Sequence, residues 1–365
     1  MDWSNNILFV TVLSFLINFG CREKPTEPNK EEFIPSKSDY IWTVDTLLYH
    51  PGGQTLMQTL WGSSPTNIYA AGHDAQGYGT MWHYDGIEWK PVDLIPAFGG
   101  MIEGPFDLSI VYGFDSTNIY AAGSRLYQTF SDKPPYFLDS TFIIHFNGKT
   151  WNEEVINRKF GALSHVGALS ASNIYFSGYG KYVYHFNNTV WNVDSVPFFY
   201  NNSNEYTINN NAVLVQNDAV PIIFSNVHNN LNGNDVYKFF KKTDSWVAID
   251  SFTNLENPKW GYVTLWKDNE GSIYSGGDAV YTLHGDSWIQ QFRPKYIIQK
   301  LWGTSKNNIF ALSILGHVYH FNGMNWNELK IPSSENMDFH GIWGTEDEIF
   351  LSAYDGYRTF IFHGK

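Results

Sequence analysis

The sequence predicts an all-β fold, a seven-bladed β-propeller of four-stranded antiparallel blades whose ring is closed by an N-terminal strand that pairs into the last blade. Three observations predict it. Aromatic residues make up 18% of the 365 residues and charged residues only 16%, which suits half-buried strands better than surface helices. A unit of the form W-G-x-x-x-x-N-I-Y-x-x-G, then H-F-N-G-x-x-W, recurs along the chain. The last copy, "GIWGTEDEIFLSAYDGYRTFIFHGK", has no closing Trp.

The spacing of the repeats sets the size of a blade. Six tryptophans close the other copies: Trp89, Trp151, Trp191, Trp246, Trp288 and Trp326. The shortest spacings are 38 residues (Trp288 to Trp326) and 40 residues (Trp151 to Trp191). A period of about 40 residues with four short strands is typical of propeller blades. In the first copy we expect strands at "TLWG", "NIYAAG", "MWHYDG" and "WKPVDL", with a tight turn at Asp85-Gly86.

The strand missing from the last copy is expected near the N-terminus. The segment "IWTVDTL" within Asp39 to Tyr49 matches "VWNVDSV" (Val190 to Val196), which is an outer strand in the third copy. We therefore expect it to pair with Tyr357 to Phe362 and to close the ring, which removes the open seam of a linear array. One propeller domain then covers residues 39–365.

The N-terminus is expected to be an export signal. An apolar run from Ile7 to Phe19 precedes Gly20 and the single cysteine, Cys21, and is too short for a bilayer span. This resembles a bacterial lipoprotein signal, which implies a signal peptide at 1–20, lipid on Cys21 and a flexible tether over 21–38. The segment "MDWSNN" has no Lys or Arg, so an uncleaved anchor or a plain secretory signal remains an alternative. In each case the domain is exported.

The charge and cysteine content exclude two classes of function. The net charge of −13 leaves no basic surface for binding nucleic acid by counterion release. A single cysteine excludes an intrachain disulfide framework and a cysteine-based metal site.

The repeat motifs together resemble bacterial exported and lipid-anchored seven-bladed β-propellers with W-G and D-G-x-x-W blades, loosely related in style to Asp-box proteins. The resemblance covers nearly all of the chain after the signal. It implies the fold and a place in the cell envelope, at the periplasm or the cell surface, and leaves the function open, because propellers host binding modules and enzymes alike.

Insertions in the repeats favour one face of the ring for binding. All the long connections are predicted between the second and third strands of a blade, or between blades, and these ends share one face. They are Gly72 to Gly79, Leu94 to Phe106, Gly123 to Ser140, Val196 to Asn210 and Ser225 to Asp235. We call this face the rim. The candidate ligand-binding residues on it are Tyr78, Arg125, Tyr127, Tyr136, Phe137, Tyr179, Tyr200 and His228. The alternative is that the aromatic residues only pack the insertions against the blades.

The sequence gives little support for a metal site or a glycosidase active site. Four histidines, each six residues before a closing Trp, are best explained by repeat geometry rather than by a metal: His83, His145, His185 and His320. Tryptophans of the W-G pairs, such as Trp61, are expected to pack between blades. The four arginines after the tether do not coincide in the repeats, so a glycosidase with an arginine cluster is not indicated. Arg125 and Glu103 are expected to form a surface ion pair. We expect no metal and no cofactor.

Three functions remain compatible with the sequence. The favoured one is a non-catalytic, monomeric envelope lipoprotein that binds glycan, protein or peptide through the rim. The second is an enzyme acting on glycans or peptides, with its acid and base at the mouth of the channel. The third is a structural or assembly partner for another protein.

Overall fold

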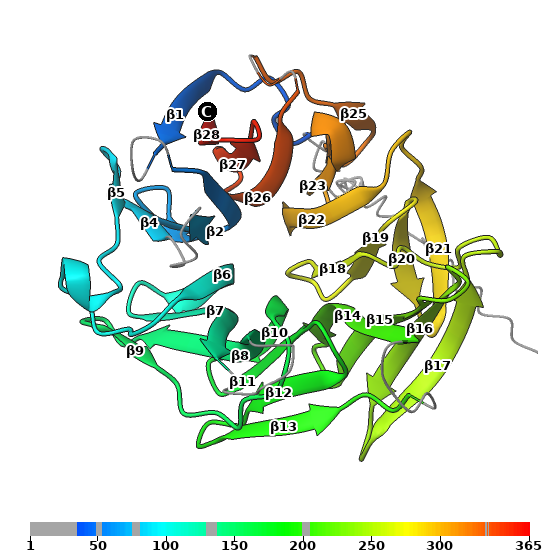
Figure 1. Cartoon of the computed structure of the whole chain (residues 1–365). Helices are drawn as coiled ribbons and strands as arrows, with labels where there is room; N and C mark the ends of the chain where they lie inside the picture. The colour runs from blue at the N-terminus through cyan, green and yellow to red at the C-terminus, as the bar shows by residue number, and fades with distance from the viewer. Residues whose placement is uncertain are drawn as a thin grey trace, which may run out of the picture. The chain divides into compact units, whose positions relative to one another are not determined.

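A computed structural model describes residues 35–48, 53–74, 81–128, 137–198, 205–332, 334 and 336–365. The chain divides into two units, Met1–Ile34 and Pro35–Lys365, and only the second contains described residues. This second unit is built from seven four-stranded antiparallel sheets. The predicted seven-bladed β-propeller is therefore confirmed (Figure 1).

Each of the first three blades is a run of four consecutive strands. Blade 1 consists of β2 (Thr55–Ser64), β3 (Asn67–Asp74), β4 (Met81–Tyr84) and β5 (Trp89–Pro91). Blade 2 consists of β6 (Phe106–Asp115), β7 (Asn118–Gln128), β8 (Phe137–Phe146) and β9 (Trp151–Glu153). Blade 3 consists of β10 (Leu163–Ser170), β11 (Asn173–Gly178), β12 (Tyr182–Phe186) and β13 (Trp191–Ser195). A short 3₁₀ turn, η1 (Pro96–Phe98), lies between blades 1 and 2.

The next three blades repeat this order, and the seventh departs from it. Blade 4 consists of β14 (Tyr206–Val215), β15 (Pro221–Asn229), β16 (Asp235–Lys242) and β17 (Trp246–Thr253). Blade 5 consists of β18 (Thr264–Lys267), β19 (Ile273–Gly276), β20 (Val280–His284) and β21 (Ser287–Phe292). Blade 6 consists of β22 (Ile298–Ser305), β23 (Asn308–Ser313), β24 (Val318–Phe321) and β25 (Trp326–Glu328), with η2 (Ile314–Gly316) before β24. Blade 7 consists of β26 (Asp338–Gly344), β27 (Ile349–Tyr354), β28 (Thr359–Gly364) and β1 (Trp42–Leu47).

The first strand of each of blades 1 to 6, together with β26, forms the inner wall of the ring. Figure 1 shows these seven strands around the centre, and each contacts the inner strands of both neighbouring blades. Six of them carry a β-bulge, a local register shift that leaves one residue unpaired. The shift nearest the start of each strand leaves a polar residue unpaired: Gln58, Ser109, Ser164, Asn211, Gln299 and His340. Four of these strands have a second shift near their end, where the unpaired residues are Ser63, Phe114, Leu169 and Thr304.

The N-terminal strand closes the ring as predicted. β1 pairs antiparallel with β28, from Trp42 opposite Gly364 to Leu47 opposite Thr359. The paired residues thus lie two positions further along than the predicted Tyr357 to Phe362. Leu47 is buried in a cluster that includes Leu60 of blade 1 and Ile361 of blade 7, so this strand also seals the seam between these blades.

The segment before β1 fastens blade 6 to blade 7. Ser36 donates from its hydroxyl to the carbonyl of Asn307 (3.0 Å), and the Ser38 hydroxyl lies 3.2 Å from Nδ1 of His320. Tyr40 packs against His320, with ring centroids 6.4 Å apart, before the chain joins β28. We call residues 36–41 the strap. It crosses from the sixth blade to the seventh.

The W-G pairs pack between blades, as expected. A Cβ at Gly113 of blade 2 would lie 2.5 Å from Cη2 of Trp61 in blade 1. A Cβ at Gly62 of blade 1 would likewise lie 3.0 Å from Cζ2 of Trp343 in blade 7. The indole of one blade therefore covers the glycine of the next, and a larger residue at the glycine would push the blades apart.

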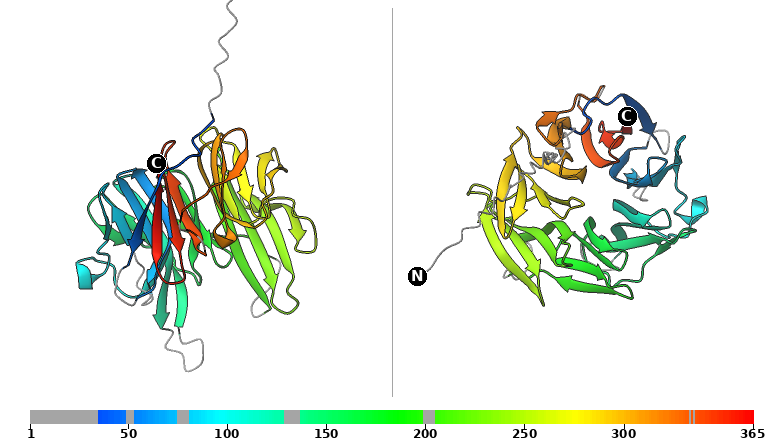
Figure 2. Two further views of the ribbon diagram at one scale, coloured as in Figure 1. Left: turned by 90° about the horizontal axis from the view of Figure 1, so that it is seen from above. Right: turned by 180° about the vertical axis from the view of Figure 1, so that it is seen from behind.

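Two of the predicted rim loops are largely strand. β7 and β8 remain paired as far as Gln128 and Phe137, inside the loop predicted from Gly123 to Ser140. β15 runs to Asn229, inside the loop predicted from Ser225. The side view in Figure 2 shows the end of the β7–β8 hairpin, in teal, extending past the body of the ring. Long hairpins rather than irregular loops therefore build much of the rim.

Candidate functional site

The predicted rim residues fall into two groups. Tyr78, Tyr136 and Tyr200 lie outside the described residues, as does the predicted lipid-bearing Cys21, and only the backbone of Phe137 is described. The remaining four lie on blades 2 to 4: Arg125 and Tyr127 on β7, Tyr179 after β11, and His228 on β15.

Two exposed aromatic rings meet on the rim between blades 2 and 3. Phe160 and Tyr179 are 51% and 45% exposed, and their rings make an edge-to-face contact with centroids 5.9 Å apart. Isolated β-bridges fix both backbones, Phe160 against Ser140 of β8 and Tyr179 against Asn209 of β14. Phe160 was missed in the sequence because it lies in a short connection, "NRKFG", rather than in an insertion. Aromatic rings held open to solvent by a fixed backbone are typical of binding surfaces.

Arg125 lies beside this aromatic pair. It pairs with Ser140, the residue that also bridges to Phe160. Its Nη1 lies 2.9 Å from Oε2 of Glu153, so the ion pair predicted with Glu103 is wrong. Burial and the neighbouring Arg158 lower the pKa of Arg125, and the Glu103 carboxylate opposes this shift. Arg158 forms a second ion pair with Glu153. Arg125 also stacks on Phe142, with 4.5 Å from Cζ to the ring centroid, and it is therefore held in place rather than free.

Two lysines extend the basic character of this part of the rim. The Nζ atoms of Lys159 and Lys181 lie 5.7 and 5.8 Å from the centroid of the Tyr182 ring. Neither lysine forms an ion pair with a described carboxylate. We call Arg125, Arg158, Lys159, Phe160, Tyr179 and Lys181 the rim strip. It is a local concentration of cations and aromatic rings on a chain whose net charge is −13.

His228 lies apart from the strip, on the hairpin of blade 4. Its Nδ1 is 3.0 Å from Oδ1 of Asp235, and the side chain is 40% exposed. A carboxylate on Nδ1 orients an imidazole and leaves Nε2 to face a ligand.

The repeat histidines have a structural role, as predicted. His83, His145, His185 and His320 each bond through Nε2 to the side-chain oxygen of the Asn that opens the second strand of the blade, at 2.6 to 3.1 Å. Each also stacks on the aromatic ring opposite it. His363 of blade 7 repeats the arrangement with Glu348 and Phe350. No group of three His, Cys, Asp or Glu suited to a metal occurs among the described residues.

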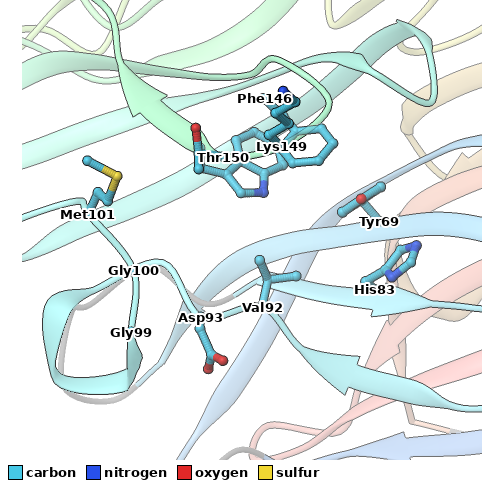
Figure 3. A pocket seen from close by; sticks show the side chains of 11 residues that line it. Tyr69, His83, Val92, Asp93, Gly99, Gly100, Met101, Phe146, Lys149 and Thr150 are labelled. Atoms are coloured by element: carbon cyan, nitrogen blue, oxygen red, sulfur yellow. The ribbon is translucent and has the colours of Figure 1, made fainter.

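A pocket of about 350 Å³ lies between blades 1 and 2 (Figure 3). Its lining includes the aromatic rings of Tyr69, Phe146 and Trp151 and the charged side chains of Asp93 and Lys149. A pocket of about 440 Å³ between blades 5 and 6 uses Tyr274, Phe321 and Trp326, which occupy the same repeat positions. These pockets therefore reflect the way in which blades meet, and we assign no specific ligand to them.

The central channel contains a further cavity, of about 240 Å³, lined by residues from the inner strands of all seven blades. Its polar lining includes Ser109, Ser164, His165 and Lys300. The Nζ of Lys300 reaches past blade 7 and donates to the carbonyl of Gln58 on blade 1 (3.2 Å). Burial lowers the pKa of Lys300 to about 8. Burial, and then the charge of Lys300, lower the pKa of His165 to about 4.

The chain matches no protein-family model, and no curated protein matches it in sequence. Solved structures do match. YCF48 bound to D1 peptide superposes with a TM-score of 0.56 at 11% identity, covering 91% of this chain and 99% of that one. A catalytically inactive virginiamycin B lyase from Staphylococcus aureus with quinupristin gives a TM-score of 0.58 at 9% identity, covering 88% of this chain and 99% of that one. These likenesses show the fold alone.

None of the described residues belongs to a helix that is long and apolar enough to span a membrane.

Proposed function

We propose that this protein is a non-catalytic, lipid-anchored protein of the bacterial cell envelope that binds a peptide or protein segment through the rim strip. The observation that carries the proposal is the Phe160–Tyr179 pair, exposed and held by backbone bridges, with basic side chains on either side. Peptides dock well on such surfaces because rigid rings bury apolar area at low entropic cost. The propeller YCF48, which is similar in fold, is bound to a peptide. Its example supports a peptide ligand over a glycan.

The charge of the rim strip indicates the charge of the ligand that it binds. Lys159 and Lys181 present ammonium groups that no described carboxylate neutralises, while Arg125 and Arg158 share Glu153. Acidic side chains on the partner would complement this surface and speed up association. We therefore propose an acidic segment that carries apolar or aromatic residues.

An immobilised array of acidic, neutral and basic peptides, with a glycan array beside it, tests the proposal. Phe160→Ala and Tyr179→Ala should weaken peptide binding at least tenfold, because buried aromatic anchors dominate binding energy. Tyr357→Ala is the matched control: this tyrosine is 42% exposed on the same face, but lies on blade 7. The proposal is wrong if neither rim variant changes binding, or if the folded protein binds only glycans.

A second candidate function rests on His228. Its orientation by Asp235 is the arrangement found in general bases. The lyase that is similar in fold is catalytically inactive as a His→Ala variant. On this alternative the protein processes peptides or glycans. Turnover of a bound array member that is lost in His228→Gln, with binding retained, would favour the enzyme over the binding module.

A further inference from the structure

The central channel contains a partly buried cation for which no described residue supplies a counter-ion. Lys300 is the third residue of β22, and among the described residues that line the cavity it alone carries a formal charge. No described carboxylate lies within ion-pair distance of its Nζ, whose hydrogen-bond partner is the neutral carbonyl of Gln58. Burial is the cause that lowers its pKa, and no neighbouring charge offsets that effect. An ammonium group that is partly withdrawn from water in this way is stabilised when an anion joins it.

The rest of the lining suits an apolar molecule with one polar end. The lining that contains Lys300 also contains the hydroxyls of Ser109 and Ser164 and the imidazole of His165. The rest of the lining is mainly apolar and aromatic, including Leu60, Trp61, Tyr112, Leu265, Trp302 and Trp343. The volume of about 240 Å³ exceeds that of a single water several times over.

We propose that the channel binds a small monocarboxylate with a compact apolar body, its carboxylate on Lys300 and its body against the aromatic walls. One lysine balances one negative charge, whereas a dianion such as phosphate would leave a net negative charge in a site whose described lining has no second cation. The hydroxyls and the neutral imidazole can donate further hydrogen bonds to the carboxylate. The carboxylate can come from a free organic acid or from the end of a peptide chain. This site is independent of the rim strip.

Isothermal titration of the whole protein with benzoate, against benzamide as its neutral counterpart, tests the proposal. A second pair of probes, acetyl-Ala-Phe with a free or an amidated C-terminus, distinguishes a chain end from a free acid. We expect at least one acid to bind and its amide to bind at least tenfold more weakly. Binding by neither acid, or equal binding by acid and amide, would overturn the proposal whatever the variants do.

Three variants locate the site. Lys300→Met should lower the affinity for the acid at least tenfold, and Lys300→Arg should retain it. Lys306→Met removes the same charge from the same blade at an exposed ion pair with Glu270, and should change nothing. Lys300→Met should also unfold at a higher temperature than the unaltered protein, because it removes the unpaired charge. Undiminished binding in a folded Lys300→Met protein would also overturn the assignment.

Discussion

The ring closure predicts a large stability difference between two residues of the same strand. Leu47 is 1% exposed in the seam between blades 7 and 1, whereas Val44, three residues earlier on β1, is 44% exposed. Leu47→Ala removes a buried isobutyl group, which costs about 2–4 kcal/mol in cores. Val44→Ala removes less and mostly from water, at a cost of about 0.5 kcal/mol.

Hydrogen exchange followed by mass spectrometry measures where this stability is lost. If β1 holds the last blade, Leu47→Ala should speed up amide exchange in β28, its hydrogen-bonded partner, and leave β12 of blade 3 unchanged. Urea unfolding of the same proteins gives the free energy of unfolding. Equal effects of the two substitutions, or unchanged exchange in β28 with Leu47→Ala, would refute the role given to this strand.

The packing, the buried histidines and the N-terminus each yield a further prediction. Gly113→Ala should lower the free energy of unfolding by about 1–3 kcal/mol, because the new Cβ would lie 2.5 Å from Cη2 of Trp61. Urea unfolding should show that adding Trp61→Leu relieves part of this loss. If the effects of the two substitutions are strictly additive, the two residues do not pack against each other as described. His320 is fully buried, and burial lowers its pKa to about 4, so the unfolded chain binds more protons than the folded protein between pH 6.5 and 4. The free energy of unfolding should therefore fall by ~3 kcal/mol as the pH drops through that window. His320→Phe, which places at this position the residue that blade 4 has there, Phe240, should make the fall smaller. Cys21→Ala should abolish the incorporation of labelled palmitate and release the protein from membranes, whereas labelling that persists would rule out this cysteine as the site.

Most of the fold could be predicted from the sequence repeats. Six closing tryptophans and one missing strand were enough to predict seven blades and the pairing of β1 with β28, because each blade repeats the same sequence motif. The ends of the strands were less predictable. β7 and β8 continue through residues that resemble a loop, since pairing across the hairpin rather than local propensity decides where a strand ends.

The candidate sites were predicted less well, for a physical reason. Phe160 and Tyr179 are 19 residues apart in sequence, and only the bridges to neighbouring strands bring their rings together. Lys300 is a single lysine on a short strand, with no local pattern around it that marks a site. Its place in the channel arises when seven inner strands close around it, which only the assembled ring reveals.

The strap has a consequence for the order in which the protein assembles. Thr43 of β1 and His363 of β28 are 320 residues apart, so the first strand of the described residues to be synthesised pairs with the last. Residues 36–41, however, bind blade 6, through His320 and Asn307. Once blade 6 has formed on the growing chain, it can hold the N-terminal segment beside the place where blade 7 will appear. The final pairing then closes a loop of tens of residues rather than hundreds, and the unpaired edge of the last blade is exposed only briefly to other chains.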